Sequence, residues 1–219
     1  MEVIKRFSLG CYPRYLYLLL LCLLLPALSS CSTSVHKLVD SSERFYRKGF
    51  SILPPQGTGW QVKDGYQQKV TFYKKGDSPK SSYVVMAYSK DHPLQFGSEE
   101  EFFSVMGKLR LAMEFRPKRN LILEKKVALA PAVGKYCLKS YSKMKDFGKK
   151  GKTNKDYLLM ENFGLICLHP SDKAMLVNFA VTHRYPPGAK DQNFKMEVDN
   201  IISSLKLEPI ERNAPPASN

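Results

Sequence analysis

The most constraining feature of the sequence is an apolar run near its start, Tyr15–Ala27. The run is about 13 residues long, whereas a helix that spans a membrane needs roughly 20. Lys5 and Arg6 precede the run, and Pro26 ends its helical character because proline lacks the backbone donor that a helix needs. This arrangement is typical of a secretory signal peptide. We therefore expect residues 1–30 to be removed and the rest of the chain to fold outside the cytoplasm.

The run leads into Leu28-Ser29-Ser30-Cys31. An aliphatic residue, two small residues and a cysteine in this order resemble the lipobox of bacterial lipoproteins. The resemblance implies that Cys31 receives a diacylglycerol on its thiol, becomes the first residue of the mature protein and anchors it to a membrane. Ser32, in place of an aspartate, implies the periplasmic face of the outer membrane if the cell has one. The alternatives are an ordinary secreted protein and an uncleaved anchor.

The chain is strongly basic, with a formal net charge of +14 at pH 7. Outside the cytoplasm such a protein is attracted to anionic lipid head groups or acidic polymers, and nucleic acid is a poor candidate because the compartment is wrong. The densest basic segment is 143–155, in which we expect Lys149, Lys150 and Lys152 to contact an anionic surface. The alternatives are that this segment is a solvated hairpin loop and that the excess lysine only keeps the domain soluble.

We expect one domain at 45–207, between a lipidated cysteine with a flexible tether at 31–44 and a disordered tail at 208–219. Apolar patterning and turn residues predict seven strands, and the strands 67–75 and 82–90 are expected to form a hairpin. Tyr83–Tyr88 is apolar at both parities, which predicts that both faces of this strand are covered. The predicted strands are Arg44–Leu53, Gln67–Lys75, Ser82–Lys90, Asn120–Ala128, Val133–Lys145, Asp156–His169 and Ala174–Tyr185.

Two further segments have apolar residues at helical spacing. The first follows Ser98, which forms a capping-box pattern with Glu101, and it ends before Pro117. Its apolar stripe, which we expect to be core, consists of Phe102, Val105, Met106, Leu109 and Met113. The second runs from about Asp191 to Leu205. Its stripe, also expected to be core, consists of Phe194, Val198, Ile201, Ile202 and Leu205. The predicted fold class is α+β, with an antiparallel sheet of about six or seven strands flanked by two main helices.

This order of elements resembles the PsbP-like fold, which extrinsic photosystem proteins share with many bacterial lipoproteins. The local match is a short strand, Gly49–Pro54, that runs into a proline-glycine turn and then Gly59-Trp60. The resemblance covers about 45–207 and departs from the family at the basic insert 147–154. It implies a domain that binds partner proteins or membranes, and the family has no shared active site to transfer.

Cys137 and Cys167 are the thiols that remain in the mature chain once Cys31 is acylated, in a compartment that permits disulfides. If 133–145 and 156–169 form one antiparallel hairpin in which paired residue numbers sum to 304, Cys137 faces Cys167. The same register pairs Tyr141 with Phe163, Lys143 with Glu161, Leu138 with Ile166 and Met144 with Met160. We therefore predict a cross-strand disulfide at a non-hydrogen-bonded position. Two reduced, buried cysteines are the alternative.

The sequence contains no recognisable catalytic, cofactor-binding or metal-binding motif. The histidines, which lack the spacing of a zinc site, are His36, His92, His169 and His183. We expect a non-enzymatic, membrane-anchored lipoprotein whose domain binds a protein partner or an envelope component, without a cofactor. The alternative is an envelope enzyme or a small-ligand carrier with an unusual site. A large apolar pocket with converging polar groups favours the alternative, and a flat basic face favours the first hypothesis.

Overall fold

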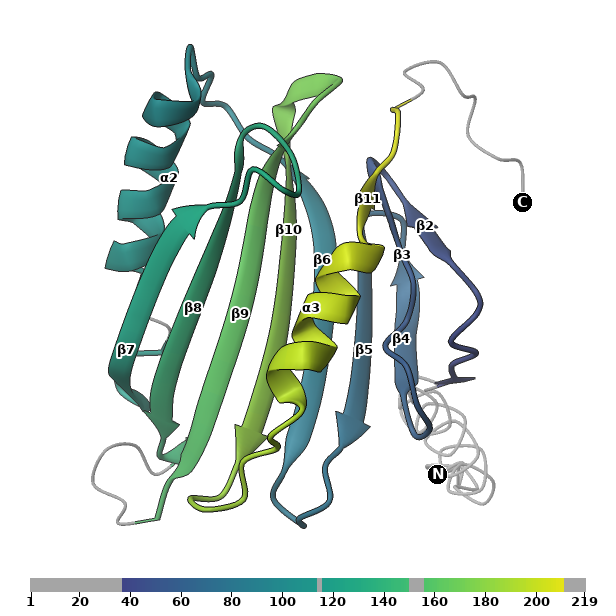
Figure 1. Ribbon diagram of the computed structural model, residues 1–219, viewed down its shortest axis with the longest axis vertical. Coiled ribbons are helices and arrows are strands. Elements are labelled where there is room, and N and C mark those ends of the chain that lie inside the picture. The colour runs from purple at the N-terminus through teal and green to yellow at the C-terminus, as the bar shows by residue number, and fades with distance from the viewer. Residues whose placement is uncertain (1–36, 114–115, 150–155, 211–219) are drawn as a thin grey trace, which may run out of the picture. The chain divides into compact units, whose positions relative to one another are not determined.

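The computed structural model describes residues 37–113, 116–149 and 156–210, which all belong to one of the chain's two compact units. These residues form an α+β fold, as predicted. Figure 1 shows helix α3 lying across one face of a large antiparallel sheet. Helix α2 packs on the other face, because its core partners come from the opposite parity of the same strands.

The large sheet has the strand order β1-β4-β5-β6-β10-β9-β8-β7, and every pairing in it is antiparallel. Its strands are β1 (Lys37–Leu38), β4 (Gln61–Tyr66), β5 (Lys69–Lys75), β6 (Ser82–Asp91), β7 (Asn120–Leu129), β8 (Cys137–Asp146), β9 (Leu158–His169) and β10 (Asp172–Tyr185). The predicted hairpin is confirmed as β5 and β6. The described sheet has eight strands instead of six or seven, because short strands such as β1 carry no periodicity. β1 also lies within the segment that we expected to be a tether.

A second, three-stranded sheet has the order β11-β3-β2. Its strands are β2 (Phe45–Arg47), β3 (Phe50–Ile52) and β11 (Lys206–Leu207). The prediction of one continuous strand at Arg44–Leu53 is wrong, because the chain reverses between β2 and β3. Gly49 makes this turn with φ of +80°, a conformation that favours glycine.

The described helices are α2 (Glu99–Ala112) and α3 (Phe194–Ser204). The predicted cap of α2 is confirmed: the Ser98 hydroxyl accepts the Glu101 N–H at 3.1 Å. The Glu101 carboxylate reaches back one residue further and accepts the Gly97 N–H at 2.7 Å. Neither described helix has the length and the apolar character needed to cross a membrane.

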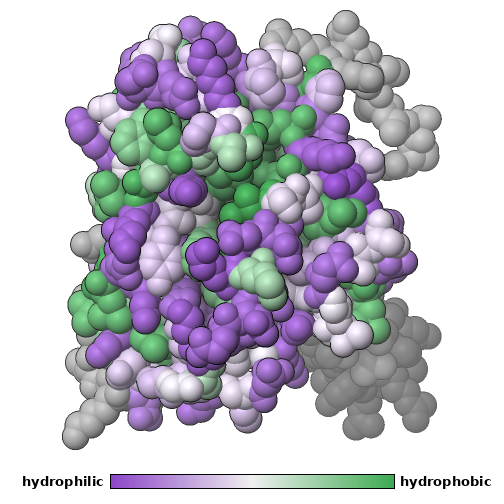
Figure 2. All heavy atoms as spheres, in the orientation of Figure 1, coloured by the Kyte–Doolittle hydropathy of each residue, from purple (hydrophilic) through white to green (hydrophobic). Residues whose placement is uncertain are grey.

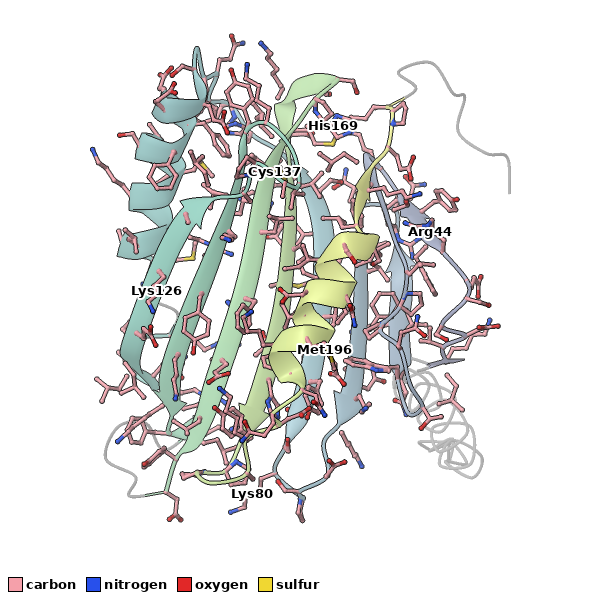
Figure 3. The ribbon with its side chains drawn as sticks, in the orientation of Figure 1. Arg44, Lys80, Lys126, Cys137, His169 and Met196 are labelled. Atoms are coloured by element: carbon pink, nitrogen blue, oxygen red, sulfur yellow. A yellow bond between two sulfur atoms is a disulfide. The ribbon has the colours of Figure 1, made fainter. Side chains whose placement is uncertain are left out.

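The two faces of the large sheet bury separate hydrophobic clusters. On the α3 face, Phe194 and Val198 pack in a cluster with Phe179 of β10, which confirms the predicted stripe of α3. Met196 lies on the exposed side of the same helix (Figure 3). On the other face, Phe102 of α2 packs in a cluster whose sheet members are Leu138, Ile166, Leu168 and Leu176.

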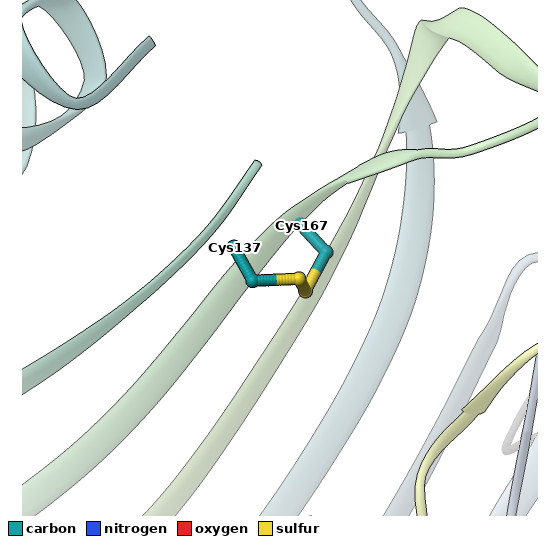
Figure 4. Close-up of a disulfide and its surroundings, with 2 residues drawn as sticks. All are labelled: Cys137 and Cys167. Atoms are coloured by element: carbon teal, nitrogen blue, oxygen red, sulfur yellow. A yellow bond between two sulfur atoms is a disulfide. The ribbon is translucent and has the colours of Figure 1, made fainter. Parts of the chain in front are cut away.

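The predicted pairing of β8 with β9 is confirmed, including every residue pair named above. Cys137 and Cys167 form a disulfide with a Cα–Cα distance of 4.1 Å (Figure 4). The Leu168 N–H donates to the Tyr136 carbonyl at 3.0 Å just outside the pair. The cysteines therefore occupy a non-hydrogen-bonded position, as predicted. β8 begins at Cys137 and not at Val133, because the preceding residues form turns.

Loss of this disulfide should lower the free energy of unfolding by about 3–4 kcal/mol, because it closes a loop of about 30 residues and restricts the unfolded chain. The double variant Cys137→Ala/Cys167→Ala tests this by urea unfolding against the oxidised wild type. Thiol titration of denatured, unreduced protein purified from the envelope is the control. Two free thiols in that titration would contradict the disulfide.

Candidate functional site

A cleft of about 550 Å³ lies on the face of the large sheet opposite α3. Helix α2 covers only one end of this face, and its last turn borders the cleft through Arg110 and Leu111. Strands β6, β10, β9 and β8 form the floor, and β7 contributes one side. The volume falls within the roughly 300–1,000 Å³ of pockets that hold drug-sized ligands.

The cleft exists because small residues meet in one row across the sheet. The register aligns Ser140 of β8 with Gly164 of β9, and Gly164 with Ala180 of β10. The neighbouring row on the same face holds Leu138 and Ile166, which pack beneath α2. Because serine, glycine and alanine have small side chains, they leave space above the sheet that admits the Arg110 side chain and opens into the cleft.

Arg110 lies above the glycine of this row. A Cβ atom added to Gly164 would come within 2.8 Å of Arg110 Nη2 and 2.6 Å of Ser140 Oγ, so the guanidinium occupies space that a side chain would need. Arg110 is half-buried, and burial lowers the pKa of its guanidinium, an effect that Tyr88 partly opposes. In the described part of the chain, no carboxylate pairs with this guanidinium. A half-buried cation without a counter-ion is costly, which makes Arg110 the main polar feature of the cleft.

The floor also contains a polar group without a partner. Asn178 on β10 is 6% exposed, and its Nδ2 makes no hydrogen bond. Buried polar groups are normally paired, and one left unpaired costs about 1–3 kcal/mol. Elsewhere in the floor, Thr182 Oγ1 donates to Asn162 Oδ1 at 3.1 Å. Asn178 therefore offers the cleft a hydrogen-bond donor that the protein itself does not use.

The rim of the cleft combines apolar side chains with cations. Val84, Leu111 and Met113 line it and are each more than one third exposed. Lys125 Nζ donates to the carbonyls of Leu111 and Met113, which attaches the end of α2 to β7. The described lining includes arginine and lysine but no aspartate or glutamate. The cleft is therefore apolar with a positive electrostatic bias.

Two predictions about coverage of this face are wrong. The stripe of α2 is core at Phe102, but Leu109 is 53% exposed and Met113 is 48% exposed. We also expected both faces of the strand Tyr83–Tyr88 to be buried, but Val84 is 37% exposed and borders the cleft. Both errors have one cause: α2 does not extend across the whole face, and residue periodicity does not encode how far a helix reaches.

A second group of polar residues surrounds His183 on the α3 face. The His183 ring is 1% exposed and stacks on Tyr83, with ring centroids 4.3 Å apart. Its Nε2 lies 3.2 Å from Ser81 Oγ, and its Nδ1 has no partner. Burial lowers the pKa of His183 to about 4, so the ring is neutral at pH 7. Phe194 of α3 packs against the ring as well, and this enclosed position is structural.

Glu161 forms a buried ion-pair network near this histidine. Tyr185 Oη donates to its carboxylate at 3.0 Å, and Lys190 Nζ lies 3.2 Å away. The predicted pair with Lys143 is confirmed at 3.8 Å. Burial, together with the charge of Glu161, raises the pKa of Tyr141 to about 12. Figure 2 shows this face of the domain, whose lower half is mainly hydrophilic. The carboxylate already has its partners, so this network also serves the fold.

The sequence matches no protein-family model, and a search of curated proteins found no match. The site is therefore assigned from geometry. Within the described ranges, no group of three His, Cys, Asp or Glu residues has the arrangement of a metal site. His92, His169 and His183 lie in separate surroundings.

Three of the predicted site residues lie outside the described residues: Cys31, Lys150 and Lys152. Lys149 is described and exposed, and it follows a buried anchor at Asp146. Arg119 and Arg184 pair with the Asp146 carboxylate, which also accepts the Gly148 N–H at 2.9 Å. The structure thus fixes the base of the basic loop, and the contact with an anionic surface stays a prediction.

Sequence reasoning missed Arg110, Asn178 and Gly164. One signal was available: the register that pairs the cysteines also places Ser140 opposite Gly164, and two small residues that face each other within a sheet indicate a hollow. The sequence does not distinguish Arg110 from the other polar residues of this amphipathic helix, so its role could not be predicted. Asn178 lies in an apolar strand, and an isolated polar residue there is a sign of a buried hydrogen bond or of a site.

The buried His183 should make stability fall between about pH 6.5 and pH 4. In this window His183 is protonated in the unfolded state and neutral in the folded state. The free energy of unfolding therefore drops by up to about 3 kcal/mol as pH falls. Urea unfolding at pH 7.5 and pH 4.5 measures the loss. His183→Phe should show a smaller loss over the same interval, and an equal loss in both proteins would contradict the assignment.

Proposed function

We propose that this chain is a non-enzymatic, lipid-anchored protein of the cell envelope whose domain binds a small apolar envelope component. The cleft on the α2 face carries the proposal. It has the size of a small-molecule site, an apolar lining, and polar groups from Arg110 and Asn178, which belong to adjacent rows of its lining. An apolar hollow with a few placed polar groups is the usual form of a ligand site.

The composition of the cleft supports binding and not catalysis. Its described lining contains no His, Cys, Asp or Glu, the side chains that most often act as general acids, general bases or nucleophiles. Ser140 and Ser142 line the cleft, but no histidine of the described lining stands beside them to activate a hydroxyl. The cleft thus supports the small-ligand carrier of the alternative hypothesis, and its lining disfavours the envelope enzyme.

The anchor and the finer fold assignment rest on the sequence. The apolar run before Cys31 supports secretion and lipidation, on the periplasmic face of the outer membrane if the cell has one. A PsbP-like domain is supported by the antiparallel sheet with helices on both faces and by the buried Trp60 that follows the Pro54 turn. It is also supported by α3, which leads directly into β11.

Filling the cleft should abolish ligand binding. Ala180→Phe places an aromatic ring above the row of small residues, and it should reduce cross-linking of an uncharged, clickable diazirine alcohol of 12 carbons by at least tenfold. Labelling is done in envelopes that contain the full-length protein, and cross-links are mapped to peptides of β8, β9 and β10. Ala128→Phe is the matched control, because Ala128 is exposed and pairs with Lys139 outside the cleft. Equal labelling of the two variants would argue against a ligand in the cleft.

Cys31→Ala should stop incorporation of labelled fatty acid and release the protein from membranes, because the acyl chains need this thiol. Metabolic labelling and membrane fractionation measure the two effects. Ser32→Ala is the control and should leave both unchanged. Full membrane retention of Cys31→Ala with an uncleaved leader would instead support an uncleaved anchor.

A further inference from the structure

The charges around the cleft favour an anionic ligand. The cations in its lining are Arg110, Arg116, Lys125 and Lys126. Lys126 pairs with Glu124, and Lys125 bonds the carbonyls at the end of α2. Arg110 is different, because it is half-buried, lies over the floor, and pairs with no carboxylate of the described chain. A ligand that supplies a negative charge at this point would act as a counter-ion that no described carboxylate provides.

Arg110 and Asn178 together suit a carboxylate. Asn178 is two residues from Ala180 on β10, so its side chain shares the face and the neighbourhood of the row over which Arg110 lies. The guanidinium presents a planar fork that matches the two oxygens of a carboxylate, and the Asn178 Nδ2 adds a neutral donor. One unpaired cation and one neutral donor balance a single negative charge.

The rest of the cleft suits an extended hydrocarbon chain. The lining comes from five strands that are adjacent in the sheet, in the order β6-β10-β9-β8-β7. Neighbouring strands are about 4.8 Å apart, so the four gaps give the floor a width of about 19 Å. Beyond a polar row of Ser142, Asn162 and Thr182, the floor becomes apolar at Ile122, Met144 and Met160. An apolar region of this width accommodates an extended hydrocarbon chain.

We infer that the cleft holds a single-chain carboxylate amphiphile, a fatty acid in chemical class. Its carboxylate lies on Arg110 and Asn178, and its chain extends from there over the floor toward Met144 and Met160. This inference rests on the proposed function, since it names the ligand class of the same cleft. It assigns Arg110 the role of selecting anionic over uncharged amphiphiles.

The test compares two diazirine probes of equal length in envelopes that carry the full-length protein: a 12-carbon carboxylate and the corresponding primary alcohol. Arg110→Gln removes the charge over the floor. Lys108→Gln removes the same charge from an exposed position on the same helix and serves as the matched control. Both probes are applied at pH 8, and cross-links are mapped by mass spectrometry to peptides of β8, β9 and β10.

Labelling of the cleft by the carboxylate probe should fall at least tenfold in Arg110→Gln and stay unchanged in Lys108→Gln. Labelling by the alcohol should stay unchanged in both variants, which also shows that they are folded. Equal labelling by the two probes, without an effect of Arg110→Gln, would overturn the carboxylate and leave the proposed function intact. Absence of cleft labelling by either probe in the wild type would overturn both.

Two further measurements address loss of labelling by both probes and the choice between a carboxylate and a phosphate head group. If Arg110→Gln loses both labels, Asn178→Leu must lower carboxylate labelling and retain alcohol labelling, and failure of this split overturns the inference. Unlabelled laurate should compete with the carboxylate probe more strongly than dodecyl phosphate. Stronger competition by the phosphate would assign the cleft to a phosphate head group instead.

Discussion

The register between β8, β9, β10 and β6 is the constraint on which the other features of the domain depend. Side chains alternate between the two faces, so one register decides both which residues meet on the α3 face and which meet on the α2 face. The disulfide between Cys137 and Cys167 lies on the first face. The same pairing brings Ser140 beside Gly164 on the second face. A slip by one residue would exchange the faces and remove both features.

The two faces of the large sheet differ in the partners that their buried charged groups have. On the α3 face, Glu161 is surrounded by donors, and among the described residues the Nδ1 of His183 and the hydroxyl of Ser89 lack a partner. On the other face, α2 buries Phe102 over one end of the sheet, Arg110 has no carboxylate partner among the described residues, and the Asn178 Nδ2 makes no hydrogen bond. The unpaired groups destabilise the folded protein when no ligand is bound. A ligand that supplies acceptors recovers this cost, so binding and stability should be coupled.

The sequence was sufficient where an interaction is local or where several pairs agree on one register. The cap at Ser98 is local, and the β8–β9 pairing was predicted because cysteines, aromatic rings and opposite charges all favour the same alignment. The turn at Gly49 was missed, because strands of three residues leave no periodic signal. The exposure of Met113 and the position of Arg110 were missed as well. Both depend on how far α2 reaches across strands that are distant in sequence, and no local pattern records that distance.

The described sheet ends in two strands, β1 and β7, which pair on one side only. Such edges can recruit a strand from another molecule, and a long one is a risk for aggregation. β1 is only two residues long. β7 has ten residues, but its middle carries Glu124, Lys125 and Lys126, and its register shifts between Ile122 and Glu124. Charge and irregularity thus make this long edge a poor template for the addition of a strand from a second molecule.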